Sequence, residues 1–329
     1  MPSPRLRLSV PGPCLPGLLL ALALVSVCCA QKVAPPPAAD PALQGRWDLV
    51  VKGPAGEYPS WLEIDKSGTS TLVGSYVGQF GSARPISEVQ VEGDGRSFVI
   101  VVPPQWEKRE TDVTIRGRLD GETLSGEVTG DNGERLAWTA RRAPALDRKP
   151  PVAWGAPIEL FNGRDLGGWK ARTPGKPNGW KVVDGVLVNA EPGNDLVSER
   201  KFEDFKLVAE FRYPPGSNSG IYLRGRYEVQ IEDNAGREAD SHLFGGVYGF
   251  LTPRINAARP AGEWQTAEIT LVGRRISVSL NGEQVIDRQI IPGPTGGALD
   301  SDEGTPGPIM LQGDHGVVEF RKLVVMPGG

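Results

Sequence analysis

Short apolar runs separated by glycine-bearing turns are the feature that most constrains the fold of this chain. Runs such as Ser97–Val102 and Arg275–Leu280 have the length and alternation of strands, and long helical periodicity is absent from the sequence. Pairs such as Asp184-Gly185 and Asn281-Gly282 follow such runs and favour two-residue hairpin turns. The 43 glycines and 30 prolines suit many tight turns. The sequence therefore predicts an all-β protein.

The first 30 residues have the anatomy of a signal peptide. Arg5 and Arg7 precede an apolar stretch at 18–27, and the small residue Ala30 stands where a signal peptidase could cut. The Cys28-Cys29 pair leaves a second interpretation open, a lipidated cysteine that anchors the chain to a membrane. We expect an exported protein, periplasmic or extracellular, that touches a membrane only through such an anchor.

Cysteine placement and charge exclude several kinds of chemistry. All three cysteines, Cys14, Cys28 and Cys29, lie in this leader, so the mature chain has no disulfide, cysteine nucleophile or thiolate metal site. The 36 basic and 40 acidic residues give a net charge of -4, and no basic run is interleaved with aromatic residues. Nucleic acid is therefore not expected as a partner.

Two proline-rich stretches divide the chain. Residues 31–43 and 144–156 are predicted linkers. The first is expected to be extended rather than packed, and the two domains are expected to meet at the second. Between them, residues 44–143 predict a small antiparallel β-barrel or meander of about seven to eight strands. The opening run 45–49, Gly-Arg-Trp-Asp-Leu, resembles the first strand of lipocalin-like barrels. Residues 157–327 have the size and strand pattern of a two-sheet jelly roll.

The second domain also resembles a known family. Segment 160–169 reads Leu-Phe-Asn-Gly-Arg-Asp-Leu-Gly-Gly-Trp, and it is followed in order by characteristic segments at 180–185, 205–212, 218–225, 227–231 and 307–316. Together these segments resemble the 3-keto-disaccharide hydrolase domain, a concanavalin A-like jelly roll. The resemblance implies a hydrolase or lyase that acts on glycosides oxidised to a ketone at the sugar 3-position. It also implies distant kinship with laminarinase-like glycosidases.

The segment 227–232 is the strongest candidate for catalytic chemistry. Alternation puts Tyr227, Val229 and Ile231 on one strand face and leaves Glu228 and Gln230 on the other. That polar face either points into a sugar-binding groove or is a solvated strand surface.

Further side chains suit sugar hydroxyls or a stacked sugar ring. Arginine, asparagine and glutamine with an aromatic platform are typical of carbohydrate sites, although Arg and Glu on neighbouring strands also form surface salt bridges. The candidates for substrate binding, besides Gln230, are Asn218, Tyr222, Arg224, Glu210, Arg212, Trp264 and Gln312.

The two histidines and an acidic segment are the remaining candidates. His315, in a loop before the last strand, is the candidate for an acid, and His242 is a second loop histidine. Asp314 and His315 are the candidates for holding a divalent metal ion, but no compact ligand spacing accompanies them, and no cofactor is assigned. Segment 300–303, Asp-Ser-Asp-Glu, could bind calcium or be a solvated acidic loop.

For the 3-keto substrate that the resemblance implies, these residues suggest elimination followed by addition of water. A 3-ketone acidifies the hydrogen at C2, so Glu228 could remove it as a base while His315 acts as acid or metal ligand. The laminarinase pattern Glu-x-Asp-x-x-Glu is not matched, because Gln230 and Asp233 replace its second and third carboxylates. A noncatalytic, lectin-like carbohydrate-binding surface protein is the main alternative, and a structural envelope protein is the third.

Overall fold

The computed structural model describes residues 38–104, 111–130, 132–151 and 153–329. The predicted signal peptide and most of the first proline-rich linker lie outside these residues. The described part of the chain belongs to one compact unit. None of its helices has the length and hydropathy needed to cross a membrane.

The prediction of an all-β protein is confirmed. The helical element in the described residues is a single 3-10 turn, η1 (Pro41–Leu43). The hairpin predicted at Asn281-Gly282 is present: both residues have positive φ, 53° and 89°, and Leu280 pairs with Glu283 across the turn. Asp184-Gly185 turns in the same way, with φ of 50° and 79°.

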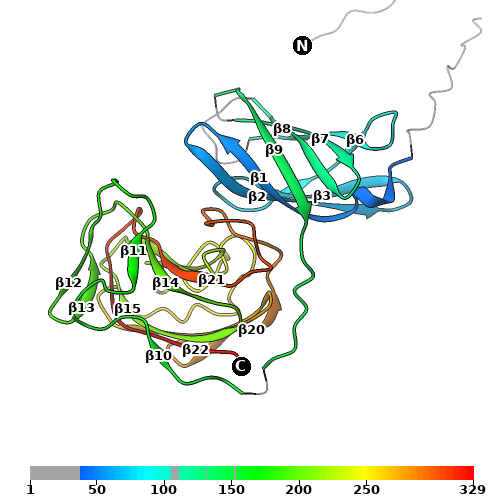
Figure 1. Cartoon of the computed structure of the whole chain (residues 1–329). Helices are drawn as coiled ribbons and strands as arrows, with labels where there is room; N and C mark the ends of the chain where they lie inside the picture. Colours follow the sequence, from blue (N-terminus) through cyan, green and yellow to red (C-terminus); the bar gives the residue numbers. More distant parts are fainter. Residues whose placement is uncertain (1–37, 105–110, 131, 152) are drawn as a thin grey trace, which may run out of the picture. The chain divides into compact units, whose positions relative to one another are not determined.

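The first sheet is an antiparallel meander that curls into a barrel-like domain, with order β4-β3-β2-β1-β9-β8-β7-β6-β5 (Figure 1). Within the described residues it has nine strands, two of them very short. Its interior is apolar and includes Trp47, Phe98 and Trp138. The strands are β1 (Gly45–Gly53), β2 (Gly56–Ser67), β3 (Thr71–Val77), β4 (Arg84–Ile86), β5 (Gln90–Val91), β6 (Ser97–Val102), β7 (Val113–Asp120), β8 (Thr123–Thr129) and β9 (Arg135–Arg142).

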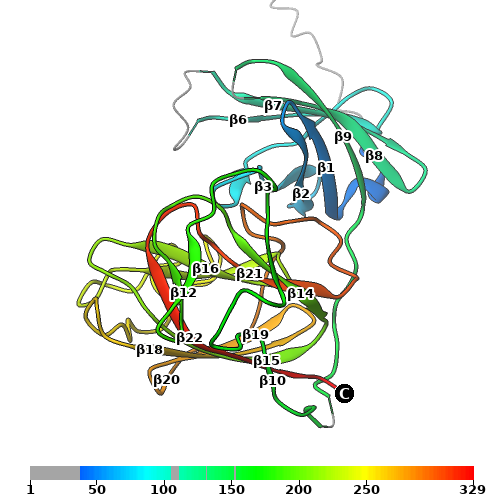
Figure 2. The same ribbon diagram turned by 60° about the vertical axis from the view of Figure 1, so that its left-hand side comes forward.

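The second domain is a sandwich of two antiparallel sheets, which Figure 2 shows as separate layers. The larger sheet consists of β12 (Trp180–Val183), β13 (Val186–Asn189), β22 (Val318–Pro327), β15 (Phe205–Arg212), β18 (Gln265–Val272), β19 (Arg275–Leu280) and β20 (Glu283–Ile290), with β10 (Ile158–Glu159) paired to β22. The smaller sheet consists of β11 (Trp169–Ala171), β14 (Leu196–Phe202), β21 (Gly307–Leu311), β16 (Asn218–Leu223) and β17 (Tyr227–Glu232).

The sandwich core decides which side chains of the smaller sheet remain for chemistry. Tyr227, Val229 and Ile231 of β17 belong to the core between the sheets. Burying each such side chain stabilises the fold by roughly 1.5–3 kcal/mol, and a one-residue shift of register would expose all three. Glu228 and Gln230 must therefore point away from the core.

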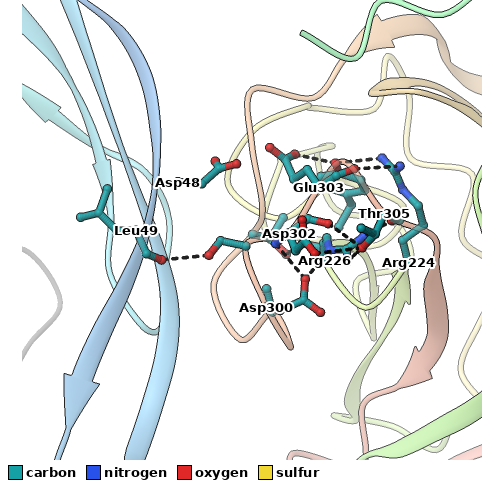
Figure 3. Close-up of polar contacts among 12 residues, drawn as sticks. Asp48, Leu49, Arg224, Arg226, Asp300, Asp302, Glu303 and Thr305 are labelled. Atoms are coloured by element: carbon teal, nitrogen blue, oxygen red, sulfur yellow. Dashed lines mark hydrogen bonds and ion pairs between the residues drawn. The ribbon is translucent and has the colours of Figure 1, made fainter. Parts of the chain in front are cut away.

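Segment 292–303 joins the second domain to the first through polar contacts (Figure 3). The Ser301 hydroxyl donates to the Leu49 carbonyl at 2.9 Å, and the Trp61 indole N–H donates to the Pro294 carbonyl at 2.8 Å. Glu303 is fully buried and forms an ion pair with Arg46. Glu303 is thus neither solvated nor part of a cluster of three or more metal-ligating side chains in the described residues.

Candidate functional site

A polar pocket lies on the face of the smaller sheet that points away from the sandwich core. Its cavity volume is about 110 Å³. The pocket is lined by Phe80, Gly81, Arg172, Asp195, Asn218, Tyr222, Glu228, Gln230, Tyr248, Gly296, Gly297, Gln312, Asp314 and His315. Strands β16 and β17 and the residues that flank β14 and β21 therefore supply most of its polar side chains.

Glu228 is a buried carboxyl group at the base of this pocket. It is 3% exposed, and burial raises the pKa of its carboxyl group to about 8. The Tyr222 hydroxyl lies 2.9 Å from Glu228 Oε2 and 2.9 Å from the Gly296 carbonyl oxygen. One hydroxyl proton cannot serve both acceptors fully. A protonated Glu228 solves this, because it donates to the Tyr222 oxygen while Tyr222 donates to Gly296.

The backbone around Glu228 is held in place from the loops beside β17. The Thr295 hydroxyl accepts a hydrogen bond from Glu228 N at 3.0 Å, and Tyr248 N donates to the Glu228 carbonyl at 3.1 Å. Glu228 is therefore held in place at both its side chain and its backbone.

Gly220 on the neighbouring strand leaves the space that the Glu228 carboxyl group occupies. A methyl group on Gly220 would lie 2.3 Å from Glu228 Oε1 and 2.9 Å from its Cγ. Gly220→Ala should therefore displace the carboxyl group and leave the fold intact, because the clash is with side-chain atoms and not with backbone. We expect any turnover that depends on this carboxyl group to fall roughly 10²-fold, with little change in Tm. Gly93→Ala, where nothing lies within 4 Å, is the matched control; an unchanged kcat in Gly220→Ala would contradict this placement.

His315 and Asp314 form a second titratable pair at the pocket. His315 Nδ1 lies 2.5 Å from Asp314 Oδ1. This hydrogen bond, together with the charges of Asp314 and Glu228, raises the pKa of His315 above its usual value. The same hydrogen bond lowers the pKa of Asp314. His315 is thus stabilised as a cation that can donate a proton.

Arg172 and Asp195 are pocket residues that sequence analysis did not single out. Arg172 pairs with Asp195 at 2.9 Å and also donates to the Gly297 and Ala298 carbonyls at 3.0 and 3.1 Å. Asp195 accepts a hydrogen bond from Gly313 N at 3.0 Å. This ion pair holds two loops at the pocket wall. No local motif marks it, since Arg172 and Asp195 lie in different loops.

Two glutamines present unpaired acceptors at the pocket. The side-chain carbonyl oxygens of Gln230 and Gln312 are buried and have no hydrogen-bond partner within the described part of the chain. The Gln230 amide nitrogen, in contrast, donates to the His242 carbonyl at 3.3 Å. Buried polar atoms generally have a partner, so both oxygens are suited to ligand hydroxyl groups.

The predicted site residues divide into two groups in the structure. Glu228, Gln230, Asn218, Tyr222, Gln312, Asp314 and His315 all line this one pocket. The other four substrate-binding candidates do not line it. The Arg224 side chain is buried and donates to Tyr227 Oη at 3.0 Å and the Gly273 carbonyl at 2.7 Å.

The remaining three candidates belong to the larger sheet or its margin. Glu210 pairs with Arg321 at 2.6 Å, and Arg212 pairs with Glu319 at 2.6 Å. The Trp264 ring lies under the guanidinium groups of Arg212 and Arg321. Glu210 and Arg212 thus form the cross-strand ion pairs that sequence analysis gave as the alternative to sugar binding.

The donor set does not fit a resident metal ion. Asp314 and His315 are hydrogen-bonded to each other, and the described residues contain no group of three or more His, Cys, Asp or Glu side chains arranged to hold a cation. His242 lies outside the pocket lining and contacts Asp240 at 2.9 Å. We therefore derive no catalytic step through a metal.

Comparison with known proteins identifies the class of the second domain. Residues 156–326 match the family described as the 3-keto-alpha-glucoside-1,2-lyase-like domain. This match covers more than half of the chain, and the chain belongs to this family. The resemblance inferred from the ordered sequence segments is thereby confirmed.

Individual proteins are similar to this chain over part of its length. A curated 3-keto-disaccharide hydrolase of Bacteroides thetaiotaomicron is 25% identical over 177 residues, which cover 42% of this chain and 60% of that relative. The chain thus spans less than two thirds of that relative's length. Two solved structures of candidate glycosyl hydrolases from Parabacteroides distasonis share 27% and 26% identity with this chain. They cover 54% and 52% of this chain and 92% and 98% of theirs, with TM-scores of 0.44 and 0.41.

Proposed function

We propose that this protein cleaves glycosidic bonds of 3-keto-glycosides by base-catalysed elimination followed by addition of water. The observation that carries the proposal is Glu228, a buried carboxyl group held by Tyr222 beside a histidine that is stabilised as a cation. Such a base and acid pair matches the two proton transfers of an elimination.

The proposed reaction proceeds in two balanced stages. Ionised Glu228 takes the proton from C2, which the neighbouring 3-ketone makes acidic. The electron pair released at C2 forms a C1–C2 double bond as the C1–O bond breaks, and His315 gives its proton to the departing oxygen. Water then adds to C1, Glu228 returns its proton to C2, and the water's remaining proton restores His315.

Charge pairing within the pocket argues against a conventional glycosidase mechanism. That mechanism needs two carboxyl groups, one on either side of the scissile bond. The carboxylates that line the pocket are Asp195, Glu228 and Asp314. Asp195 is paired with Arg172 and Asp314 with His315. Glu228 alone among them forms no ion pair in the described residues, which favours a mechanism with one base.

Product analysis tests this proposal. The purified mature protein is incubated with 3-keto-glycosides and with their unoxidised parents, with and without chelator, and the products are followed by NMR. Release of the leaving group from the keto forms alone would support the proposal. Release from the unoxidised parents would indicate a conventional glycosidase, and binding without turnover in both panels would replace the enzyme with the lectin-like alternative.

The pH dependence of kcat/KM should be bell-shaped. Because Glu228 must be ionised to accept a proton, the rate should rise with pH towards the pKa of about 8 that burial gives this group. The rate should fall again as His315 loses its proton above its raised pKa. Profiles measured from about pH 5 to 10 check this. His315→Gln should lose the alkaline fall, and an acid limb near the ordinary glutamate pKa would contradict the assignment of Glu228.

We further propose that this reaction takes place outside the cytoplasm. The signal-like anatomy of the first 30 residues supports an exported protein in the periplasm or extracellular medium. Cell fractionation with an antibody to the mature chain tests this, and recovery of the full-length protein in the cytoplasm alone would contradict it.

A further inference from the structure

The loop between β3 and β4 of the first domain reaches the pocket of the second domain. Phe80 and Gly81 of this loop line the pocket together with the residues of the jelly roll. Phe80 is 56% exposed, although large aromatic side chains are usually buried. The core of the first domain therefore does not account for the placement of this ring.

Specific contacts hold the loop at the pocket. Gly297 N donates to the Gln79 carbonyl at 2.8 Å. Ser82 Oγ lies 2.7 Å from His242 Nε2. A methyl group on Gly296 would lie 2.5 Å from the Gly81 carbonyl oxygen, so these backbones are in direct contact. Three residues of this loop, Gln79, Gly81 and Ser82, thus touch segments that flank Glu228 and Gln230.

Further contacts between the two domains hold this loop at the pocket. The buried Arg46–Glu303 ion pair and the Trp61 to Pro294 hydrogen bond join the same two domains. The Trp61 ring also lies 6.0 Å from the Phe250 ring, centroid to centroid. The position of Phe80 is therefore built into the fold.

We infer that Phe80 is a specificity-determining residue that binds the leaving group of the substrate, as a platform for a flat apolar face such as an aryl or pyranosyl ring. The inference rests on the proposed function. The jelly-roll side of the pocket offers Glu228, His315 and two unpaired glutamine oxygens, which suit the polar keto sugar. Phe80 offers the apolar surface that a second ring can cover.

The space beyond Phe80 is consistent with a leaving group on this side. Phe80 also borders a hollow of about 200 Å³ in the first domain. Tyr58, Tyr76 and Glu134 line that hollow. A leaving group with a ring stacked on Phe80 would thus have space to extend into this hollow, away from Glu228.

The test compares Phe80→Ala with the wild type on 3-keto-glucosides that carry a methyl, a phenyl or a glucosyl leaving group. KM and the calorimetric Kd should increase roughly 5- to 30-fold for the phenyl and glucosyl compounds and stay unchanged for the methyl compound. Phe80→Trp should restore both values. Val101→Ala, which trims an exposed side chain on β6 of the same domain, should change neither.

The outcomes separate this inference from the proposed function. If the wild type turns over none of the three compounds, the proposed function fails, and the calorimetric Kd series still decides the role of Phe80. Equal changes for all three leaving groups, or no change for any, would overturn the inference while leaving turnover by the wild type intact.

Discussion

Glu228→Gln should lower kcat on 3-keto-glycosides roughly 10²- to 10⁴-fold, which is the range for loss of a general base. Glutamine has nearly the same shape as the protonated carboxyl group. Its amide can donate to the Tyr222 oxygen while Tyr222 donates to the Gly296 carbonyl, so the pocket keeps its geometry. The substitution therefore removes the base and leaves the binding surface in place. Single-turnover rates and ligand Kd, measured on the same preparation, check this.

Stability provides the control for Glu228→Gln. Burial raises the pKa of this carboxyl group in the folded protein to about 8, above its ordinary value of 4.5. The folded state therefore favours the protonated form of Glu228. The stability that this group contributes at low pH is lost as pH rises from about 4.5 to 8. Glutamine removes this cost, so the variant should be more stable at pH 7 by up to about 3 kcal/mol. Loss of turnover together with lower stability would indicate misfolding instead of loss of a base.

The part of the site that sequence could predict depends on strand alternation. Tyr227, Val229 and Ile231 are buried in the core, so Glu228 and Gln230 must point the other way. This alternation with a period of two can be recognised from the sequence alone. Residues of loops that adjoin these strands, such as His315, could be named because loops at sheet ends commonly build sites.

The rest of the site depends on contacts that no local pattern records. Arg172 reaches the Gly297 carbonyl across 125 residues of sequence, and Phe80 comes from another domain. Arg224, in contrast, was predicted from a local pattern but does not line the pocket. It closes a polar strand pattern, but its φ of 53° begins a turn there, and its side chain packs against Tyr227. Turn geometry decides the direction of such a side chain.

Glu303→Ala should lower the free energy of unfolding by about 3–5 kcal/mol, because it removes one of the two carboxylates paired with the buried guanidinium of Arg46. Both side chains are almost fully buried, and burial already lowers the pKa of Arg46 to about 10. The change also removes the acceptor of the Tyr227 hydroxyl, which donates to Glu303 Oε1 at 2.5 Å. Urea denaturation measures the loss. Asp302→Ala, an exposed neighbour in the same segment, should cost less than about 1 kcal/mol.

The effect of Glu303→Ala should also depend on pH. Asp48 lies 3.1 Å from Arg46 and can neutralise it in the variant, but only while Asp48 is ionised. Burial raises the pKa of Asp48 to about 6. Above that pH Asp48 compensates in part, and below it Arg46 has no ionised partner in the described residues, so the loss should grow as pH falls through about 6. A loss that is constant between about pH 5 and 8 would show that Asp48 does not share the charge of Arg46. If the variant also raises KM for large leaving groups as Phe80→Ala does, the ion pair that joins the two domains positions the Phe80 loop as well.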